Sequence, residues 1–185
     1  MIVLICGPSG SGKTTLLRQI AMMPRARIHV VTVSRKDTRN EGDIAKVEVS
    51  LKHFKRFRFP YIYYYDDSVY GFSLSQEEID SLDYVFLDYP GEYPSCPELR
   101  NIDWRGLLVL PPSRDDLMAR LTRAHRAQRT ASALMEYDEI QREIAIGEYA
   151  DEAKWQVFYS KSLHCGSLVV DAIKHERLFM KAVNR

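Results

Sequence analysis

MIVLICGPSGSGKTTLLRQIAMMP, residues 1–24, decides the fold class of this chain. Residues 1–6 form a short, continuous apolar run, which is the pattern of a parallel strand buried on both faces. After Gly12, apolar side chains recur at helical spacing until Pro24 ends the pattern, and this predicts a helix. The chain therefore begins with a strand, a loop and a helix.

The loop between these two elements, GPSGSGKTT at residues 7–15, satisfies the pattern G-x-x-x-x-G-K-[ST]. Its glycines let several backbone N–H groups point inward, and the helix N-terminus adds partial positive charge. We expect Lys13 to reach the β- and γ-phosphates of a nucleotide, and the Thr14 hydroxyl to bind Mg²⁺. The predicted ATP- and Mg²⁺-binding loop, here called the phosphate loop, comprises Gly7, Pro8, Ser9, Gly10, Ser11, Gly12, Lys13, Thr14 and Thr15.

Further apolar runs, separated by enough chain for crossovers, indicate more strands. They span 27–34, 84–89, 106–112 and 155–160. Helical patterns begin at Ser113 and cover about 131–147 and 166–183. Strands that alternate with helices predict an α/β fold, with a mainly parallel sheet between two helical layers. We expect residues 1–185 to form one domain of this three-layer α/β/α type.

Composition limits the function classes. The chain has 26 basic and 25 acidic side chains, so neither disorder nor a globally polyanion-seeking surface is indicated. Cys6, Cys96 and Cys165 lie far apart without metal-ligand spacing, which fits a reducing compartment. The apolar N-terminal run is too short to span a bilayer and has no basic prefix or cleavage site. We expect a cytoplasmic protein.

The segment 35–81 has a different character, because it begins charged and becomes rich in aromatic residues. Arg35 and Arg39 follow the second predicted strand, so we expect them at the C-terminal edge of the sheet, beside the phosphate loop. The planar guanidinium group suits phosphate oxygens. The alternative is that both arginines are solvated or pair with neighbouring acids. The segment is the candidate acceptor-binding insertion.

A second set of cations lies on the helix that begins at Ser113. Arg120, Arg123, Arg126 and Arg129 recur every three residues, which places them along one face. A solvated helix face explains such a row equally well. In the functional interpretation, Arg123 and Arg126 close over the transferring phosphate as part of a lid.

Asp88 ends the apolar run 84–89. A carboxylate at the end of a buried strand can hold Mg²⁺ through water or orient an acceptor. The alternative is a cap for the following turn.

Binding a triphosphate does not name a reaction. The chain is small and lacks the N-K-x-D motif that reads guanine in GTPases, which argues against a switch protein or a large ATPase. Small kinases remain. They need an acceptor site and mobile positive charges that close over the phosphoryl group and exclude water.

Together the motifs resemble the guanylate kinase family. The likeness is carried by ICGPSGSGKTTLL, VSRKDTRNEGD, VYGFS and LLVLPPSRDDLMARL, which occur in the family's order along most of the chain. It implies a P-loop kinase fold, with 35–81 as the acceptor-binding insertion and 123–134 as the lid. It also implies that Lys13 and Thr14 bind ATP, and that Arg35, Arg39, Tyr70 and Ser73 lie at the acceptor phosphate. With the roles argued above, the predicted catalytic residues are Lys13, Arg123, Arg126 and Asp88. A weaker resemblance connects the chain to ribose 1,5-bisphosphate phosphokinases, through the short insertion.

The chain departs from the family at the positions that read guanine. Asp43 replaces the glutamate that closes the arginine motif, and Pro90 stands where a second acid is expected. A proline side chain cannot accept the N–H groups of guanine, and a recognition site that loses an acceptor loses discrimination. The predicted reaction is therefore transfer of the ATP γ-phosphate to a nucleoside monophosphate or a related phosphorylated acceptor.

Two alternatives stay open. KHFKRFRF, residues 52–59, interleaves cations with phenylalanines, which suits a nucleic acid, although the rings can equally be the insertion's own core. A kinase acting on a hydroxyl of a nucleic acid or modified nucleotide, such as a phage-type DNA base kinase, would need a carboxylate base. The candidates for that base are Asp37, Asp66, Asp67 and Asp88. The other alternative is a non-catalytic guanylate-kinase-like interaction module, which would have no reason to keep Gly12, Lys13 and Thr14 together.

Overall fold

The computed structural model describes residues 1–24, 26–34, 44–65, 67–90, 99–124, 129–160 and 171. Its main sheet is five-stranded, and each strand pairing in it is parallel. The strand order is β2 (Ala26–His29), β7 (Tyr84–Asp88), β1 (Ile2–Cys6), β8 (Trp104–Leu110) and β9 (Trp155–Tyr159). This confirms the predicted parallel sheet. The helix predicted over 166–183 lies outside the described residues, apart from Asp171.

Strand β1 lies at the centre of this sheet and is buried along its whole length. Val3 and Ile5 join a core cluster with the apolar face of α1 (Lys13–Ile20). Leu4 and Cys6 point the other way, into a cluster that includes side chains of α4 (Arg114–Arg123) and α5 (Thr130–Ala145). Helices therefore cover both faces, as the continuous apolar run predicted.

The helices differ in whether a side chain caps their first N–H groups. A serine hydroxyl caps α2 (Leu51–Phe54), α3 (Gln76–Asp80) and α4, where it accepts a hydrogen bond from a backbone N–H of the first turn. The predicted start of α4 after Ser113 is confirmed. Helix α5 has no side-chain cap, and α1 follows Gly12, which has no side chain to offer its N–H groups.

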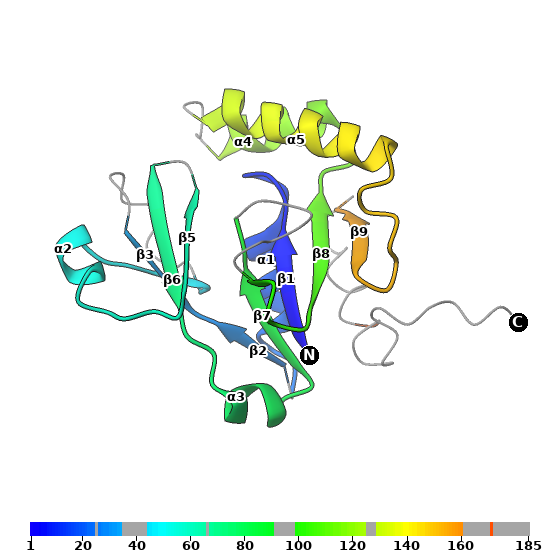
Figure 1. Ribbon diagram of the computed structural model, residues 1–185. Coiled ribbons are helices and arrows are strands. Elements are labelled where there is room, and N and C mark those ends of the chain that lie inside the picture. Colours follow the sequence, from blue (N-terminus) through cyan, green and yellow to red (C-terminus); the bar gives the residue numbers. More distant parts are fainter. Residues whose placement is uncertain are drawn as a thin grey trace, which may run out of the picture.

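A second, four-stranded sheet stands beside the first (Figure 1). Its order is β4 (Lys46–Glu48), β3 (Val31–Ser34), β6 (Ser68–Phe72) and β5 (Tyr61–Tyr65). Strand β3 is parallel to β4 and antiparallel to β6, and β6 forms a hairpin with β5. Most of this sheet comes from the segment predicted as the acceptor-binding insertion.

The prediction of one core strand over 27–34 is wrong. The run is divided at Val30, which is 45% exposed, and its halves belong to different sheets. Strand β2 pairs with β7 in the main sheet, whereas β3 pairs with β4 and β6. An apolar β-branched run indicates burial, but it does not indicate which strand is the hydrogen-bonding partner. The small sheet therefore begins at Val31, before the predicted insertion.

No helix within the described ranges is both long enough and apolar enough to cross a membrane.

Candidate functional site

The phosphate loop follows β1 at a point where the direction of the chain's crossovers changes. The chain leaves β1 toward β2 on one side of the sheet and leaves β7 toward β8 on the other. Ligands of open α/β sheets bind at the carboxyl ends of strands at such a switch point. Ile5 is in register with Asp88, so this carboxylate lies beside the start of the loop.

The glycines of the loop hold backbone conformations that other residues rarely adopt. Gly7 has φ of 126° and Gly12 has φ of 111°. A Cβ atom on Gly7 would stand 2.1 Å from the carbonyl oxygen of Val109 on β8. Both the backbone angle and the close approach to β8 therefore require glycine at this position.

A matched pair of glycine variants separates these two requirements. Gly147 has φ of 88° but open space around its missing Cβ, with Ala150 Cβ at 4.0 Å as the one contact. We expect Gly147→Ala to cost about 1–2 kcal/mol of stability, from the backbone conformation alone. Gly7→Ala should cost more and abolish ATP binding, because β8 backbone has to shift. Denaturant unfolding and ATP titration measure both, and equal effects of the two variants would contradict this account.

Lys13 lies folded onto its own loop. Its Nζ donates hydrogen bonds to the carbonyl oxygens of Gly7 and, at 3.0 Å, of Pro8. Burial lowers the pKa of Lys13, while the carboxylates of Asp88 and Glu136 oppose that shift. A partly buried ammonium group is thus held between backbone oxygens and two acids, at the place where the motif predicts phosphate.

Two observations test whether a chain of phosphates fits this loop. Helix α1 starts without a side-chain cap, so its first N–H groups are open to an anion. The buried hydroxyl of Ser11 has no hydrogen-bond partner among the described residues. Both features fit the phosphates of ATP, which residues 7–15 would hold. For Mg²⁺, the oxygen donors would be the hydroxyl of Thr14 on α1 and the carboxylate of Asp88.

Arg120 holds the phosphate loop through the backbone of Ser11. Its guanidinium donates hydrogen bonds to the Ser11 carbonyl at 3.0 Å and to the Ser160 hydroxyl at 2.7 Å. It also donates to the Ser160 carbonyl. The Ser160 hydroxyl in turn donates to the Ser11 carbonyl at 2.6 Å. The first arginine of the predicted row is therefore a positioning residue that connects α4, the loop and the end of β9.

Removing this arginine should loosen the loop. We expect Arg120→Ala to lower ATP affinity about ten- to a hundredfold, since hydrogen bonds from a charged group contribute about 1.5–3 kcal/mol. Arg114→Ala is the control on the same helix. Its side chain is 53% exposed and pairs at 3.2 Å with Asp138, which is 45% exposed, so its loss should change little. Calorimetry with a non-hydrolysable ATP analogue measures both, and a similar loss in both variants would contradict the assignment.

Lys46 joins the small sheet to the core. Its Nζ lies 2.5 Å from Oδ2 of Asp88 and 5.9 Å from the centre of the Tyr70 ring. The side chains of Lys46 and Asp88 are 11% and 4% exposed, so the ion pair is buried. Lys46 was not predicted from the sequence, because nothing near this lysine in the chain indicates that it pairs with Asp88.

A second contact joins the small sheet to the helical layer. The Tyr65 hydroxyl, on β5, donates a 3.0 Å hydrogen bond to Oε2 of Glu136 on α5. Glu136 is also close enough to affect the pKa of Lys13. Glu136 was not predicted as a site residue either, because the sequence around it is the same as that around a solvent-exposed glutamate on a helix.

The other predicted site residues lie as follows. Tyr70 is buried, and its ring stacks on that of Tyr63 with centroids 5.0 Å apart. Ser73 is exposed just after β6. The acceptor arginines 35 and 39, the lid arginine 126 and the alternative bases Asp37 and Asp66 lie outside the described residues.

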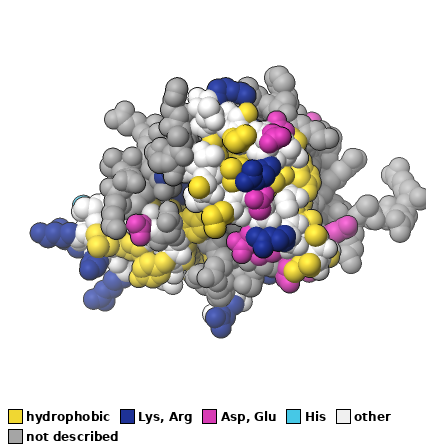
Figure 2. All heavy atoms as spheres, turned by 90° about the horizontal axis from the view of Figure 1, so that it is seen from above, with side chains coloured by type: hydrophobic (Ala, Val, Ile, Leu, Met, Phe, Trp, Pro, Cys, Tyr) yellow, Lys and Arg dark blue, Asp and Glu magenta, His cyan; other side chains and the backbone are white. Residues whose placement is uncertain are grey.

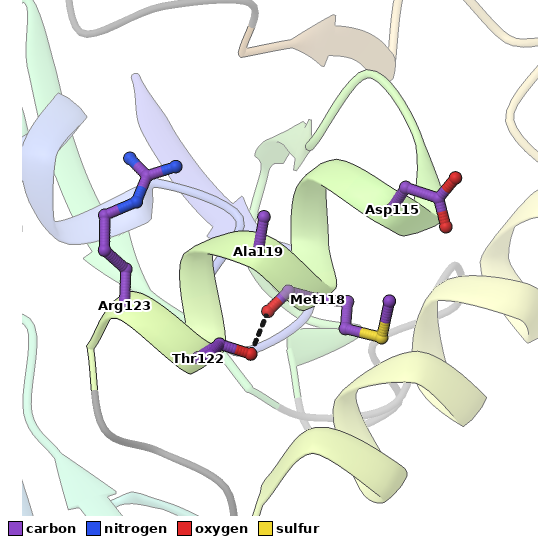
Figure 3. A pocket seen from close by; sticks show the side chains of 5 residues that line it. All are labelled: Asp115, Met118, Ala119, Thr122 and Arg123. Carbon is purple, nitrogen blue, oxygen red and sulfur yellow. Dashed lines mark hydrogen bonds between the residues drawn. The ribbon is translucent and has the colours of Figure 1, made fainter.

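Arg123 is exposed at the last turn of α4. It lines a shallow hollow on the outside of this helix, together with Asp115, Met118, Ala119 and Thr122 (Figure 3). Figure 3 shows Arg123 and Asp115 at opposite ends of this helix. No residue of the phosphate loop lines this hollow, so it is a separate surface feature.

Comparison with known proteins addresses the fold. No protein-family model and no curated protein matches the sequence. Among solved structures, the chain is similar to the crystal structure of guanylate kinase from Anaplasma phagocytophilum. The TM-score is 0.58 at 15% sequence identity, over 98% of this chain and 87% of that chain. The chain therefore has a guanylate kinase-like fold, as the resemblance of its motifs implied.

Proposed function

We propose that this protein transfers the γ-phosphate of ATP to a nucleoside monophosphate or a related phosphorylated acceptor in the cytoplasm. One observation carries the proposal. A glycine-rich loop, an uncapped helix start and a partly buried lysine meet at the switch point of a parallel sheet, next to a second sheet. The guanylate kinase-like fold supports it.

The roles follow from charge. An acceptor phosphate is already ionised, so the reaction needs positioning and cations rather than a general base. Lys13 leaves the carbonyl groups of its own loop to pair with the phosphates of ATP, and Arg120 keeps that loop in place. Thr14 and Asp88 would hold Mg²⁺, which would supply positive charge beside the transferring group.

The acceptor would lie between the two sheets. Lys46 is a cation at that boundary, between Asp88 and Tyr70. We assign Arg35, Arg39, Tyr70 and Ser73 to the acceptor phosphate, with 35–81 as the insertion that holds it. Arg123 and Arg126, in the lid 123–134, complete the positive charge around the transferring phosphoryl group.

A second candidate, transfer to a hydroxyl group of a nucleic acid or modified nucleotide, is favoured by Glu136. This carboxylate accepts the Tyr65 hydrogen bond from the small sheet and lies close enough to Lys13 to affect its pKa. A hydroxyl acceptor has to lose a proton, and a carboxylate within reach can take it.

One experiment tests the proposal and distinguishes the two acceptors. ADP release is measured with nucleoside monophosphates, sugar phosphates and hydroxyl-bearing oligonucleotides. We expect turnover with a phosphorylated acceptor, and only a small change in it in Glu136→Gln. Turnover with a hydroxyl acceptor that falls by about 10²-fold or more in this variant would identify the second candidate. No acceptor-dependent ADP release above that of Lys13→Met would contradict both.

A further inference from the structure

We propose that the outer face of the small sheet binds single-stranded nucleic acid. The surface, here called the α2 face, consists of Lys52, Lys55, Arg56, Arg58, Phe57 and Tyr64. The inference goes beyond the proposed function and does not depend on it. The α2 face lies within the insertion 35–81, but it contains none of the residues assigned to the acceptor phosphate and none of the phosphate loop.

The segment that carries most of the α2 face is positively charged. Residues 51–60 contain four basic and no acidic side chains, in a chain whose net charge is +1. All four cations are exposed, and none of them forms an ion pair with a described residue. In Figure 2, dark blue side chains gather at the left margin, over α2, beside an apolar patch. Lys52 lies on α2 and the other three cations follow its last residue, Phe54, so the four do not form one solvated helix face.

Two of the three phenylalanines in this segment are core. Phe54 is 5% exposed and lies 5.2 Å from Phe59, ring centre to ring centre. Both rings cover Gly71 on β6, where a Cβ would stand 2.3 Å from Phe59 and 2.9 Å from Phe54. Phe57 remains 44% exposed and stacks on the exposed His53 at 5.6 Å. Phe57 also stacks on Phe59, with ring centres 5.3 Å apart, so it lies at the edge of this aromatic cluster as the exposed ring of the three.

Strand register places a second exposed ring on the same face. Residues directly opposite each other in an antiparallel pair point to the same side of the sheet, and so do residues two apart along a strand. Ile62 pairs with Gly71, and Tyr64 pairs with Val69. Because Phe59 packs on Gly71, Tyr64 lies on the side covered by α2. Its ring is 75% exposed.

This combination fits one class of partner. Cations follow a phosphate backbone, and exposed rings stack on bases of any sequence once these bases are unpaired. A duplex hides the faces of its bases, and polyphosphate would use the cations alone. Four unpaired cations beside two exposed aromatic rings therefore favour a single-stranded polynucleotide.

The test is fluorescence anisotropy of the full chain with a labelled oligothymidylate of about 16 nucleotides, without ATP. The logarithm of the association constant should fall with the logarithm of salt concentration, with a slope of about −3 for four phosphate contacts at about 0.7 each. Lys55→Gln/Arg56→Gln should reduce the slope by about 1.4. Arg114→Gln/Arg142→Gln removes the same charge from α4 and α5 and should leave the slope unchanged.

The aromatic contribution is tested at Tyr64. Tyr64→Ala should weaken binding about tenfold, whereas Tyr64→Phe keeps the ring and should bind like the wild type. Lys13→Met should still bind the oligonucleotide, which separates this result from phosphate transfer. The proposal is overturned if Tyr64→Ala binds as tightly as wild type, if the control pair weakens binding equally, or if charge-matched polyphosphate displaces the oligonucleotide as well as unlabelled oligothymidylate does.

Discussion

Lys13→Met is expected to lower ADP release about 10²–10³-fold and, at the same time, to raise the temperature of thermal unfolding. The loss of turnover follows because a neutral side chain cannot stabilise charge on the transferring phosphoryl group. The gain in stability follows because the folded chain buries this ammonium group, which lowers its pKa from the ordinary lysine value. The folded chain therefore keeps the Lys13 ammonium group although its charged form lowers stability, and such a cost is common at functional sites.

The stability that Lys13→Met gains over the wild type should decrease as pH rises. Below the lowered pKa, Lys13 is protonated in both the folded and the unfolded chain, so the full penalty is present and the methionine variant is more stable. The penalty disappears as pH rises from the lowered pKa toward 10.5, the ordinary lysine value. Thermal unfolding at several pH values should show the two proteins converging at alkaline pH. Lys52→Met, at an exposed lysine, should change neither turnover of a small acceptor nor stability.

Lys46→Met is expected to destabilise the fold by about 3–5 kcal/mol, because it removes the ammonium group that lies 2.5 Å from the buried carboxylate of Asp88. Asp88→Asn should also destabilise, since it leaves the ammonium group buried. The double variant removes both charges and should cost less than the sum of the single variants, with a coupling of about 1–3 kcal/mol. Urea unfolding measures all four proteins.

Turnover separates structure from chemistry at this pair. The double variant should regain much of the stability but none of the activity, because Asp88 is assigned to Mg²⁺ and Lys46 to the acceptor side. The exposed pair of Arg114 and Asp138 supplies the control, where a similar cycle should give a coupling of about 1 kcal/mol or less. Additive effects at Lys46 and Asp88, or full activity in the double variant, would contradict their placement in the site.

The sequence predicted those parts of the fold whose conformation depends on residues close together in the chain. The apolar run of β1, the glycines of the phosphate loop and the serine before α4 each determine local conformation, and each is where the pattern placed it. The division of 27–34 between two sheets was not predictable, because it depends on which distant strands pair with each half.

Tertiary contacts limited the prediction of the site in the same way. Lys46 and Glu136 gain their importance from Asp88 and Tyr65, which are distant in sequence. The prediction that Arg120, Arg123, Arg126 and Arg129 lie along one helix face is wrong, because α4 ends at Arg123 and Arg129 directly precedes α5. Spacing also did not show that Arg120 holds the phosphate loop. Helical spacing gives the face on which a residue lies, not what that face contacts.

The central claim is that the phosphate loop at the end of β1 binds the phosphates of ATP, and titration calorimetry with a non-hydrolysable ATP analogue and Mg²⁺ tests it most directly. The account predicts one binding site per chain, weakened at least about tenfold in Lys13→Met and absent in Gly7→Ala. Failure of the wild-type protein to bind the analogue, or equal affinity in Lys13→Met, would contradict it.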